Sequence, residues 1–484
     1  MAESLRRNII TGIVWQYFQR IGNQLIHFIV SLILARLLMP EDFGIVALLG
    51  VFITISNIFI DSGFGNALIQ RKEIDDVDLN SVFYLNVAIS FLIYLAVFLF
   101  APLISSFYDM PQLASLLRVL ALQVIFMAFS CVQQSILIRN MKFKNNFYIG
   151  MFSVIVSSTV GIIMAYSGKG VWSIVFTQLI AQLCTTIGLW YFVGWRPKLV
   201  FSWDRICSLF SYGSRILGGS IINVIYNNIY NLVIGQRYSS VDLGFYNRGQ
   251  LLPTTIIDTS STSFNSVLFP ALSSIQDDKE RYKVLLRKSA KMISFVVFFI
   301  SAFMLIFSPQ IIKFLLGDKW LSSVPFMRIV CCTVCVNPLI VINQTISTSL
   351  GRSDYYMKTT IISKLLAICL IGLGTLYDVY FMVFMGTIAN IVVWLITARY
   401  NSQLIGYTNR EMFQDDMPPL FLSALACTIS YFIVTIIPLH YVIELLIGGL
   451  LSIILYIAFS FITKQQSLNY IIEVLNIKKY IHYE

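Results

Sequence analysis

The 484-residue sequence has little charge: only 12% of its residues are Asp, Glu, Lys or Arg, while 57% are hydrophobic. Soluble domains carry about a quarter charged residues, so this scarcity excludes an ordinary water-soluble enzyme. The sequence also lacks a long polar stretch that could form a soluble domain, and it lacks the phosphate-binding loop G-x-x-x-x-G-K-[ST]. These absences argue against a catalytic head, a receptor ectodomain and an ATP-hydrolysing pump.

Cysteine, histidine and acidic residues are too few or too dispersed for the usual sites. The eight cysteines all lie inside apolar stretches, so they form no secreted disulfide framework. Cys331-Cys332-x-x-Cys335 has no His or carboxylate near it and is interpreted as apolar packing rather than as a metal site. The acidic run at residues 75–78 is interpreted as a solvated loop. We therefore expect no catalytic residues, no bound metal and no cofactor.

The sequence is instead rich in long apolar runs. A bilayer core of about 30 Å needs about 20 apolar residues per helix, and fourteen segments are candidates by that rule. They run approximately over 10–37, 42–68, 82–107, 113–138, 147–166, 171–193, 206–234, 243–275, 284–307, 324–350, 359–376, 379–400, 420–437 and 442–462. The sequence predicts an all-α polytopic membrane protein with about fourteen transmembrane helices.

Lys and Arg are distributed unevenly among the short loops between these segments. If the N-terminus is cytoplasmic, 23 of the 34 basic residues lie on the inner side, 7 on the outer side and 4 inside helices. Because basic residues accumulate in cytoplasmic loops, we expect both termini in the cytoplasm. The net charge of +10 then reflects topology rather than nucleic-acid binding.

An internal repeat relates the two halves of the chain. Residues 31–44 match residues 231–244 at a shift of 200, which aligns Gly44 with Gly244. Six helices precede the repeat, so both halves have the same orientation. Two parallel six-helix bundles related by an axis along the membrane normal are a transporter plan, with the substrate between the halves. We expect two lobes at 1–200 and 201–405, and two extra helices with a cytoplasmic tail at 406–484.

Several motifs resemble those of one transporter family. They are Leu34-Ala-Arg-Leu-Leu-Met-Pro-Glu-Asp-Phe-Gly44, Leu243-Gly-Phe-Tyr-Asn-Arg-Gly-Gln250, the segment 269–281 and Gly317-Asp-Lys-Trp320. In this order, over roughly residues 1–400, they resemble the polysaccharide-repeat flippases. These are the O-antigen, capsule and colanic-acid exporters of the multidrug/oligosaccharidyl-lipid/polysaccharide superfamily. The resemblance implies a cavity between two lobes and transport of an undecaprenyl-pyrophosphate-linked sugar unit from the cytoplasmic to the outer leaflet.

Polar residues recur every three or four positions on the first and seventh predicted helices. On each helix they form one stripe, which should face protein or a watery cavity because polar groups in lipid are costly. The expected cavity lining is Gln16, Asn23, Gln24, His27, Asn223 and Asn227. The alternative is hydrogen bonding between helices without a cavity.

Two arginines lie at nearly the same depth near the membrane midplane. Arg20 is on the first helix and Arg215 on the seventh. A guanidinium binds phosphate oxygens in a bidentate manner, so we expect Arg20 and Arg215 to bind the pyrophosphate, with Arg248 as a third candidate. Arg248 is near a helix end and could instead reach the membrane surface. Asp61 could pair with Arg20 as a static ion pair.

Asp61 and Asp258 are also candidates for binding a coupling proton or sodium ion. Asp258 follows Pro253, which removes a backbone donor and is expected to free carbonyl groups about one turn earlier, at residues 249–251. Expected partners are the lipid-linked oligosaccharide, membrane lipids, and a polysaccharide polymerase and chain-length regulator, with a monomer as the functional form.

Two alternative functions remain open. A multidrug antiporter of the same superfamily would need an acidic cavity for cationic drugs. A membrane-embedded polysaccharide polymerase would need a large outer loop.

Overall fold

The computed structural model describes residues 2–60, 65, 68, 69, 71, 74–436 and 440–475, and the side chains of 2–14, 17, 20, 207–217 and 472–475 lie outside that description. By its contacts the chain divides into two units, Met1–Gly244 and Phe245–Glu484.

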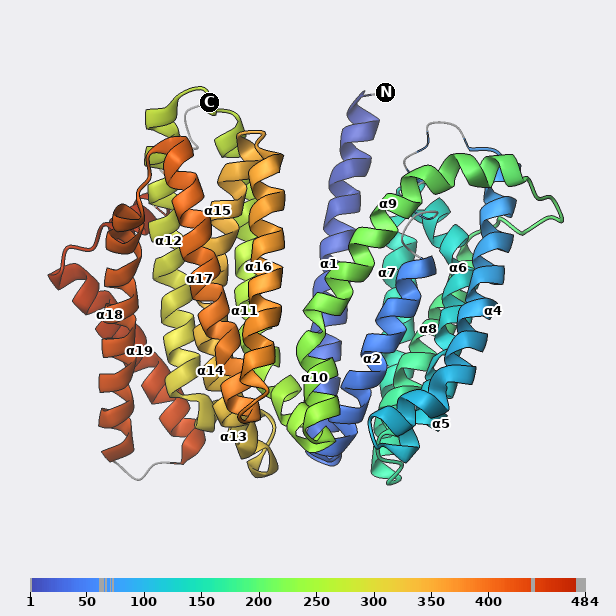
Figure 1. The fold of residues 1–484 in the computed structure, drawn as a ribbon, viewed down its shortest axis with the longest axis horizontal. Coiled ribbons are helices and arrows are strands. Elements are labelled where there is room, and N and C mark those ends of the chain that lie inside the picture. The colour runs from blue at the N-terminus through green and yellow to red at the C-terminus, as the bar shows by residue number, and fades with distance from the viewer. Residues whose placement is uncertain are drawn as a thin grey trace. The chain divides into compact units, whose positions relative to one another are not determined.

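The first unit is a bundle of helices (Figure 1). Its elements are α1 (Ala2–Leu37), α2 (Pro40–Ile60), α4 (Asp76–Phe107), α5 (Pro111–Leu120), α6 (Leu122–Arg139), α7 (Phe143–Tyr166), α8 (Trp172–Phe192), α9 (Trp203–Asn227) and α10 (Ile229–Arg237). Helix α7 packs against α1 and α8, α4 packs against α5 and α6, and α9 packs against α2 and α4.

The second unit is also helical in its described residues, and α11 (Ser240–Ser273) enters it from the first unit. Its other elements are α12 (Lys279–Ile306), α13 (Ser308–Leu315), the 3-10 helix η2 (Asp318–Ser323), α14 (Val324–Val334), α15 (Asn337–Ser349), α16 (Ser353–Gly374), α17 (Val379–Ile405), α18 (Asn409–Ile436), α19 (Tyr441–Ile462) and α20 (Gln466–Leu475). Helix α12 packs against α14 and α18, α17 against α14 and α16, and α18 against α19 (Figure 1).

The predicted all-α fold is confirmed, and each of the fourteen predicted segments falls on helix in its described residues. The fourth, seventh and tenth segments are each divided between two helices: α5 and α6, α9 and α10, α14 and α15. The tenth segment breaks where Pro338 occupies the first turn of α15, a position at which proline starts a helix but cannot continue one. Helix α18 begins at Asn409, well before the predicted start at Leu420.

Eleven helical stretches in the described part of the chain are long and apolar enough to cross a membrane. The molecule is therefore a multi-pass membrane protein. In α1 the described apolar stretch is the shorter Ile21–Leu37. Helix α11, the eighth predicted segment, is described along its whole length, carries many polar residues and is not among the eleven. A membrane helix of that kind needs a face that contacts protein or water instead of lipid.

The aspartates that align in the repeat cap equivalent helices. Asp42 Oδ2 accepts a hydrogen bond from the backbone N–H of Met39 at 2.9 Å, at the start of α2. Asp242 Oδ2 accepts one from the backbone N–H of Ser239 at 3.3 Å, at the start of α11. The repeat therefore has a structural counterpart: the same residue type fixes the same helix start in both halves.

The aligned glycines pack against each other's helix start. A Cβ atom on Gly44 would lie 1.7 Å from the carbonyl oxygen of Ser240, and a Cβ on Gly244 would lie 1.9 Å from that of Pro40. Pro40 and Ser240 are themselves equivalent in the repeat. The contact is thus reciprocal, as local two-fold symmetry requires, and its closeness explains why glycine occupies both positions.

The contact-based boundary at residue 244 differs from the lobe boundary that the repeat places at residue 200. The difference arises because α9 and α10 pack against α2 in the first unit. The predicted division follows the sequence repeat rather than these contacts. It stays a prediction, with lobes at 1–200 and 201–405 and extra helices at 406–484.

Candidate functional site

Helix α1 presents two different exposed faces. Gln16, Gln24 and His27 are exposed on one side. The exposed hydrophobic side chains, at 54–63% exposure, are Phe18, Ile21, Leu25 and Ile29. At about 100° per residue these two groups fall on different sides of the helix, and α1 packs against α7. One exposed side thus suits lipid, and the other suits water or a polar ligand.

Asn23 occupies a different position from the other predicted lining residues of α1. It is half-buried against α7, where a Cβ on Gly150 would lie 3.1 Å from Asn23 Nδ2. The neighbouring Gln19 accepts a hydrogen bond from Asn146 Nδ2 of α7 at 3.1 Å. Gln19, which is not among the predicted lining residues, therefore joins α1 to α7 in the manner that the alternative interpretation describes, and Asn23 packs against the same helix.

Helix α9 repeats the two-faced pattern of α1. Asn223 and Asn227 are exposed, and so are Ile222 at 62% and Ile225 at 44%. Helical spacing separates the two asparagines from the two isoleucines by at least about 100°. The polar sides of α1 and α9 thus have equivalent places in the repeat, although their role as a cavity lining stays a prediction.

The charged residues of the predicted anion site are only partly described. Arg20 lies in α1 and Arg215 in α9, but both side chains, and Asp61 altogether, lie outside the described residues. Arg248 lies on α11 and is half-buried. The pyrophosphate site and the alternative Arg20–Asp61 ion pair both stay predictions.

Helix α11 runs through Pro253 without ending. The Thr254 hydroxyl donates to the carbonyl oxygen of Gln250 at 2.8 Å, and the Thr255 hydroxyl donates to that of Leu251 at 2.6 Å. The expectation that these two carbonyl groups are free for water or ions is therefore wrong. Threonine hydroxyls bond back one turn to both carbonyl groups. The carbonyl of Gly249, the acceptor one turn before Pro253, stays a prediction.

Asp258 lies further along α11 and is exposed at a cavity of about 420 Å³ in the second unit. Asn265 of α11 and Asn337 and Gln344 of α15 line the same cavity. Sequence reasoning selected Asp258 but missed these amides. A signal was present: Asn337 and Gln344 are seven residues apart, two helical turns, in an otherwise apolar segment.

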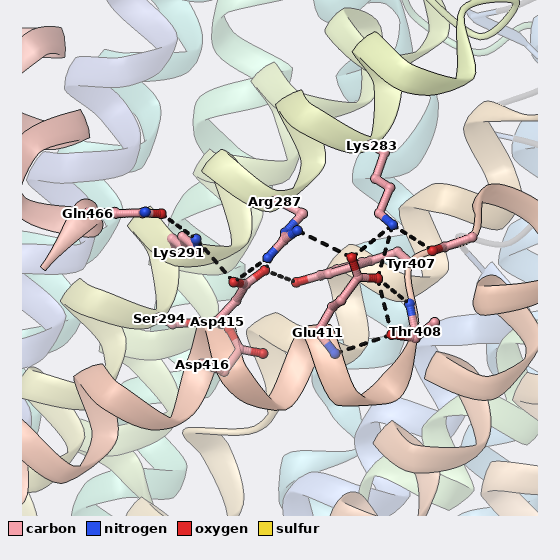
Figure 2. Close-up of polar contacts among 11 residues, drawn as sticks. Lys283, Arg287, Lys291, Ser294, Tyr407, Thr408, Glu411, Asp415, Asp416 and Gln466 are labelled. Carbon is pink, nitrogen blue, oxygen red and sulfur yellow. Dashed lines mark hydrogen bonds and ion pairs between the residues drawn. The ribbon is translucent and has the colours of Figure 1, made fainter.

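A network of ion pairs joins α12 to α18 (Figure 2). The Asp415 carboxylate accepts hydrogen bonds from Arg287 Nε at 2.7 Å and Arg287 Nη2 at 2.8 Å. It also pairs with Lys291 Nζ at 3.0 Å and accepts a hydrogen bond from the Tyr407 hydroxyl at 2.9 Å. Only 4% of the Asp415 side chain is exposed. Four charge-assisted contacts therefore compensate its burial.

Four more residues extend this network on either side of Asp415. Lys283 Nζ pairs with Glu411 at 2.9 Å, and the Ser294 hydroxyl donates to the buried Asp416 at 2.7 Å (Figure 2). Burial raises the pKa of the Tyr407 hydroxyl, which therefore keeps its proton and remains a donor. Sequence reasoning counted the bases of α12 only as topological signals. The network holds α18 against α12, and we interpret it as structural.

The acidic run at residues 75–78 is only partly a solvated loop. Asp75 caps α4 by accepting the backbone N–H of Asp78 at 2.8 Å, and this hydrogen bond lowers the pKa of the Asp75 carboxyl. Asp78 is 1% exposed and pairs with Arg71 at 3.1 Å and Arg205 at 3.8 Å. The solvated-loop interpretation is wrong for Asp78, because its bases come from outside the acidic run.

The helical fold is that of multi-pass membrane transporters. Among solved structures the chain is similar to the lipid II flippase MurJ in an inward closed conformation, with TM-score 0.71 and 16% identity over 94% of this chain and all of that one. It is also similar to an inward-facing multidrug resistance MATE family transporter of the MOP superfamily, with TM-score 0.58 and 16% identity over 81% of this chain and 98% of that one. At such identities the likeness shows the fold alone.

The family model described as "Polysaccharide biosynthesis protein" matches residues 33–325, and the chain belongs to that family. This membership confirms the resemblance carried by the sequence motifs. One relative is the lipopolysaccharide biosynthesis protein WzxC of Escherichia coli K12, 25% identical over 68% of this chain and 67% of that protein. Another is the teichuronic acid biosynthesis protein TuaB of Bacillus subtilis 168, 23% identical over 88% and 89%. A third is the succinoglycan biosynthesis transport protein ExoT of Rhizobium meliloti 1021, 27% identical over 57% and 56%.

Proposed function

We propose that this protein moves an undecaprenyl-pyrophosphate-linked oligosaccharide from the cytoplasmic to the outer leaflet for surface polysaccharide synthesis. The observation that carries the proposal is the pair of two-faced helices, α1 and α9, in a member of a polysaccharide biosynthesis family. Sugars and a pyrophosphate cannot cross hydrocarbon without a large desolvation cost. A polar path through the protein removes that cost, while the isoprenoid tail stays in the bilayer.

The relatives support transport rather than catalysis. ExoT is named a succinoglycan biosynthesis transport protein and MurJ a lipid II flippase. The MurJ-like and MATE-like fold supports alternating access by two rocking lobes. Membership in the polysaccharide biosynthesis family favours a sugar-bearing lipid over the cationic drugs of the antiporter alternative.

The roles of individual residues form part of this proposal. The guanidinium groups of Arg20 and Arg215 would bind the pyrophosphate through paired hydrogen bonds, and Arg248 is a third candidate for this role. The polar side chains expected to contact the sugars are Gln16, Asn23, Gln24, His27, Asn223 and Asn227. A proton or sodium gradient would supply the energy, with Asp61 or Asp258 as the carboxylate that binds the ion. No cofactor is required.

The proposal includes a location and partners. Both termini lie in the cytoplasm, as the distribution of Lys and Arg favours. The protein spans the bacterial inner membrane, which its bacterial relatives in polysaccharide biosynthesis support. The protein acts as a monomer, because one chain carries both halves of the repeat. A polysaccharide polymerase and a chain-length regulator would receive the product at the outer face.

Deletion and complementation in the native host test the proposed function. Loss of the gene should abolish the surface polysaccharide and leave its lipid-linked unit on the cytoplasmic side, and the wild-type gene should restore export. Arg20→Ala and Arg215→Ala should cripple export at normal protein levels, whereas Arg237→Ala, an exposed control at the end of α10, should not. Unchanged polysaccharide in the deletion strain would refute the proposal.

A second pair of variants separates an anion site from a static ion pair. Arg20→Lys keeps the charge but loses the planar fork, so it should restore export only partly. If Arg20 only neutralises Asp61, the double variant Arg20→Ala, Asp61→Asn should restore both protein level and export. Full export by that double variant would remove Arg20 from the pyrophosphate site.

A further inference from the structure

A polar cavity between α11 and α15 is suited to a ligand with hydroxyl groups. Its volume of about 420 Å³ lies within the range of small-molecule sites. Asp258, which opens onto it, is near the middle of the 34-residue α11. Both helices belong to the second unit in this region, so the cavity does not depend on how the two units are arranged.

Hydrogen bonds within the protein decide which atoms face this cavity. Asn390 Nδ2 donates to Asn337 Oδ1 at 2.9 Å, which leaves the Asn337 amide N–H groups as donors among the residues that line the cavity. The Thr345 hydroxyl lies within hydrogen-bond distance of both Asn265 Oδ1 and the carbonyl oxygen of Val341. When it donates to Asn265 Oδ1, the Asn265 amide N–H groups remain as donors. A carboxylate beside amide N–H groups matches neighbouring hydroxyls, because each hydroxyl both donates and accepts.

The rest of the lining fits one sugar ring. The Thr262 hydroxyl donates to the carbonyl oxygen of Asp258 at 2.7 Å, so its lone pairs remain available as acceptors. Gln344 adds an amide with both donor and acceptor groups, and Ile340 and Val341 supply an apolar wall. A sugar has the same division, with hydroxyl groups at its edge and C–H groups on its faces.

The negative charge of the lining excludes pyrophosphate as the ligand of this cavity. Asp258 is the one charged residue among those that line the cavity, all of which lie in the described part of the chain. A carboxylate with no base among the other lining residues repels pyrophosphate. Asp258 is also a candidate for binding the coupling ion, and the two assignments differ in one observable: a sodium site binds the ion without a sugar.

We propose that this cavity binds one uncharged sugar of the transported oligosaccharide, with Asp258, Asn265 and Gln344 hydrogen-bonded to its hydroxyls. The assignment rests on the proposed function and adds a specificity to it. An acidic sugar would place its carboxylate beside that of Asp258, so the site rejects uronic acids at this position of the repeat unit.

Saturation-transfer NMR of the full-length protein in phospholipid nanodiscs tests this assignment. Nanodiscs are used because maltoside detergents carry sugar groups that would compete with the probes. The probes are the methyl glycosides of glucose, galactose and mannose, and methyl glucuronide as the acidic counterpart. At least one neutral glycoside should give signals, and the glucuronide should bind about tenfold more weakly or not at all. Gln344→Ala should weaken neutral binding about tenfold. Ser263→Ala, on α11 but outside the lining, should leave it unchanged.

Asp258→Asn gives the sharpest comparison, because it keeps the shape of the side chain and removes its charge. This variant should bind the neutral glycoside and the glucuronide with similar affinity. No glycoside signal, equal binding of both sugars by the wild type, or sodium-23 line broadening that depends on Asp258 without sugar binding would each overturn the assignment. Polysaccharide export by the same strains is scored separately, so wild-type export without glycoside binding refutes the sugar site alone.

Discussion

Replacing Gly44 with alanine tests the reciprocal contact between the repeated helix starts. The new Cβ would lie 1.7 Å from the carbonyl oxygen of Ser240, whereas ordinary contacts begin near 3.4 Å. The segments around residues 40–44 and 240–244 would therefore have to separate by about 1.7 Å. The obstacle is backbone, which cannot rotate out of the way as a side chain can.

The expected destabilisation follows from that geometry. Overpacking a well-packed contact costs about 1–3 kcal/mol, and the rigid obstacle at Gly44 places this variant at or above the upper end. Gly50→Ala is the matched control on the same helix, because a Cβ there has no neighbour within 4 Å. Without a clash, alanine in a helix is favoured over glycine by up to about 1 kcal/mol.

Thermal unfolding of the purified protein, followed by tryptophan fluorescence, measures both variants. Gly44→Ala and Gly244→Ala should each lower the melting temperature, and Gly50→Ala should leave it unchanged or raise it. The double variant should cost less than the sum of the two, because one separation of the segments relieves both clashes. Equal melting temperatures for Gly44→Ala and Gly50→Ala would refute the contact.

Three further outcomes are expected. Asp415→Ala leaves the bases of the α12–α18 network without their shared carboxylate and should lower the free energy of unfolding by about 3–5 kcal/mol. A double-mutant cycle with Arg287→Ala should give a coupling free energy of about 1–3 kcal/mol, consistent with hydrogen bonds between charged groups. A coupling near zero would contradict the structural role of the network. The hydrogen bond from Asp78 lowers the pKa of Asp75, so the cap is complete above the ordinary pKa and is lost as the pH falls through the lowered one. The melting-temperature loss caused by Asp75→Ala should accordingly shrink on acidification, and a constant loss contradicts that assignment. ATP should not stimulate the purified protein once ion gradients are clamped, because the sequence has no nucleotide-binding loop.

The helices could be predicted because lipid imposes a simple rule on sequence. A membrane-spanning segment must satisfy its backbone internally and face hydrocarbon with apolar side chains, so apolar runs mark helices directly. The alignment of Gly44 with Gly244 was used only to infer that the two halves have the same orientation. It also marked a contact, because the two residues meet in the structure.

Long-range polar contacts could not be predicted in the same way. Asp415 and Asp416 were placed in a loop before Leu420, because acidic residues lower the hydropathy of a segment whatever their partners. Their partners, Arg287 and Ser294, lie more than a hundred residues earlier. A polar residue in a membrane helix is acceptable once it is paired, and pairing across helices leaves no periodic signal in the sequence.

The central claim is tested most directly by reconstitution. The purified protein is placed in liposomes whose inner leaflet carries an undecaprenyl-pyrophosphate-linked, radiolabelled oligosaccharide, and an external glycosidase releases label from units that reach the outer leaflet. Under an imposed ion gradient and without ATP, release should proceed well above the rate of protein-free liposomes and should fall toward that rate for Arg20→Ala. Release at the protein-free rate by the folded wild-type protein, with its lipid-linked substrate and either a proton or a sodium gradient present, would contradict the account.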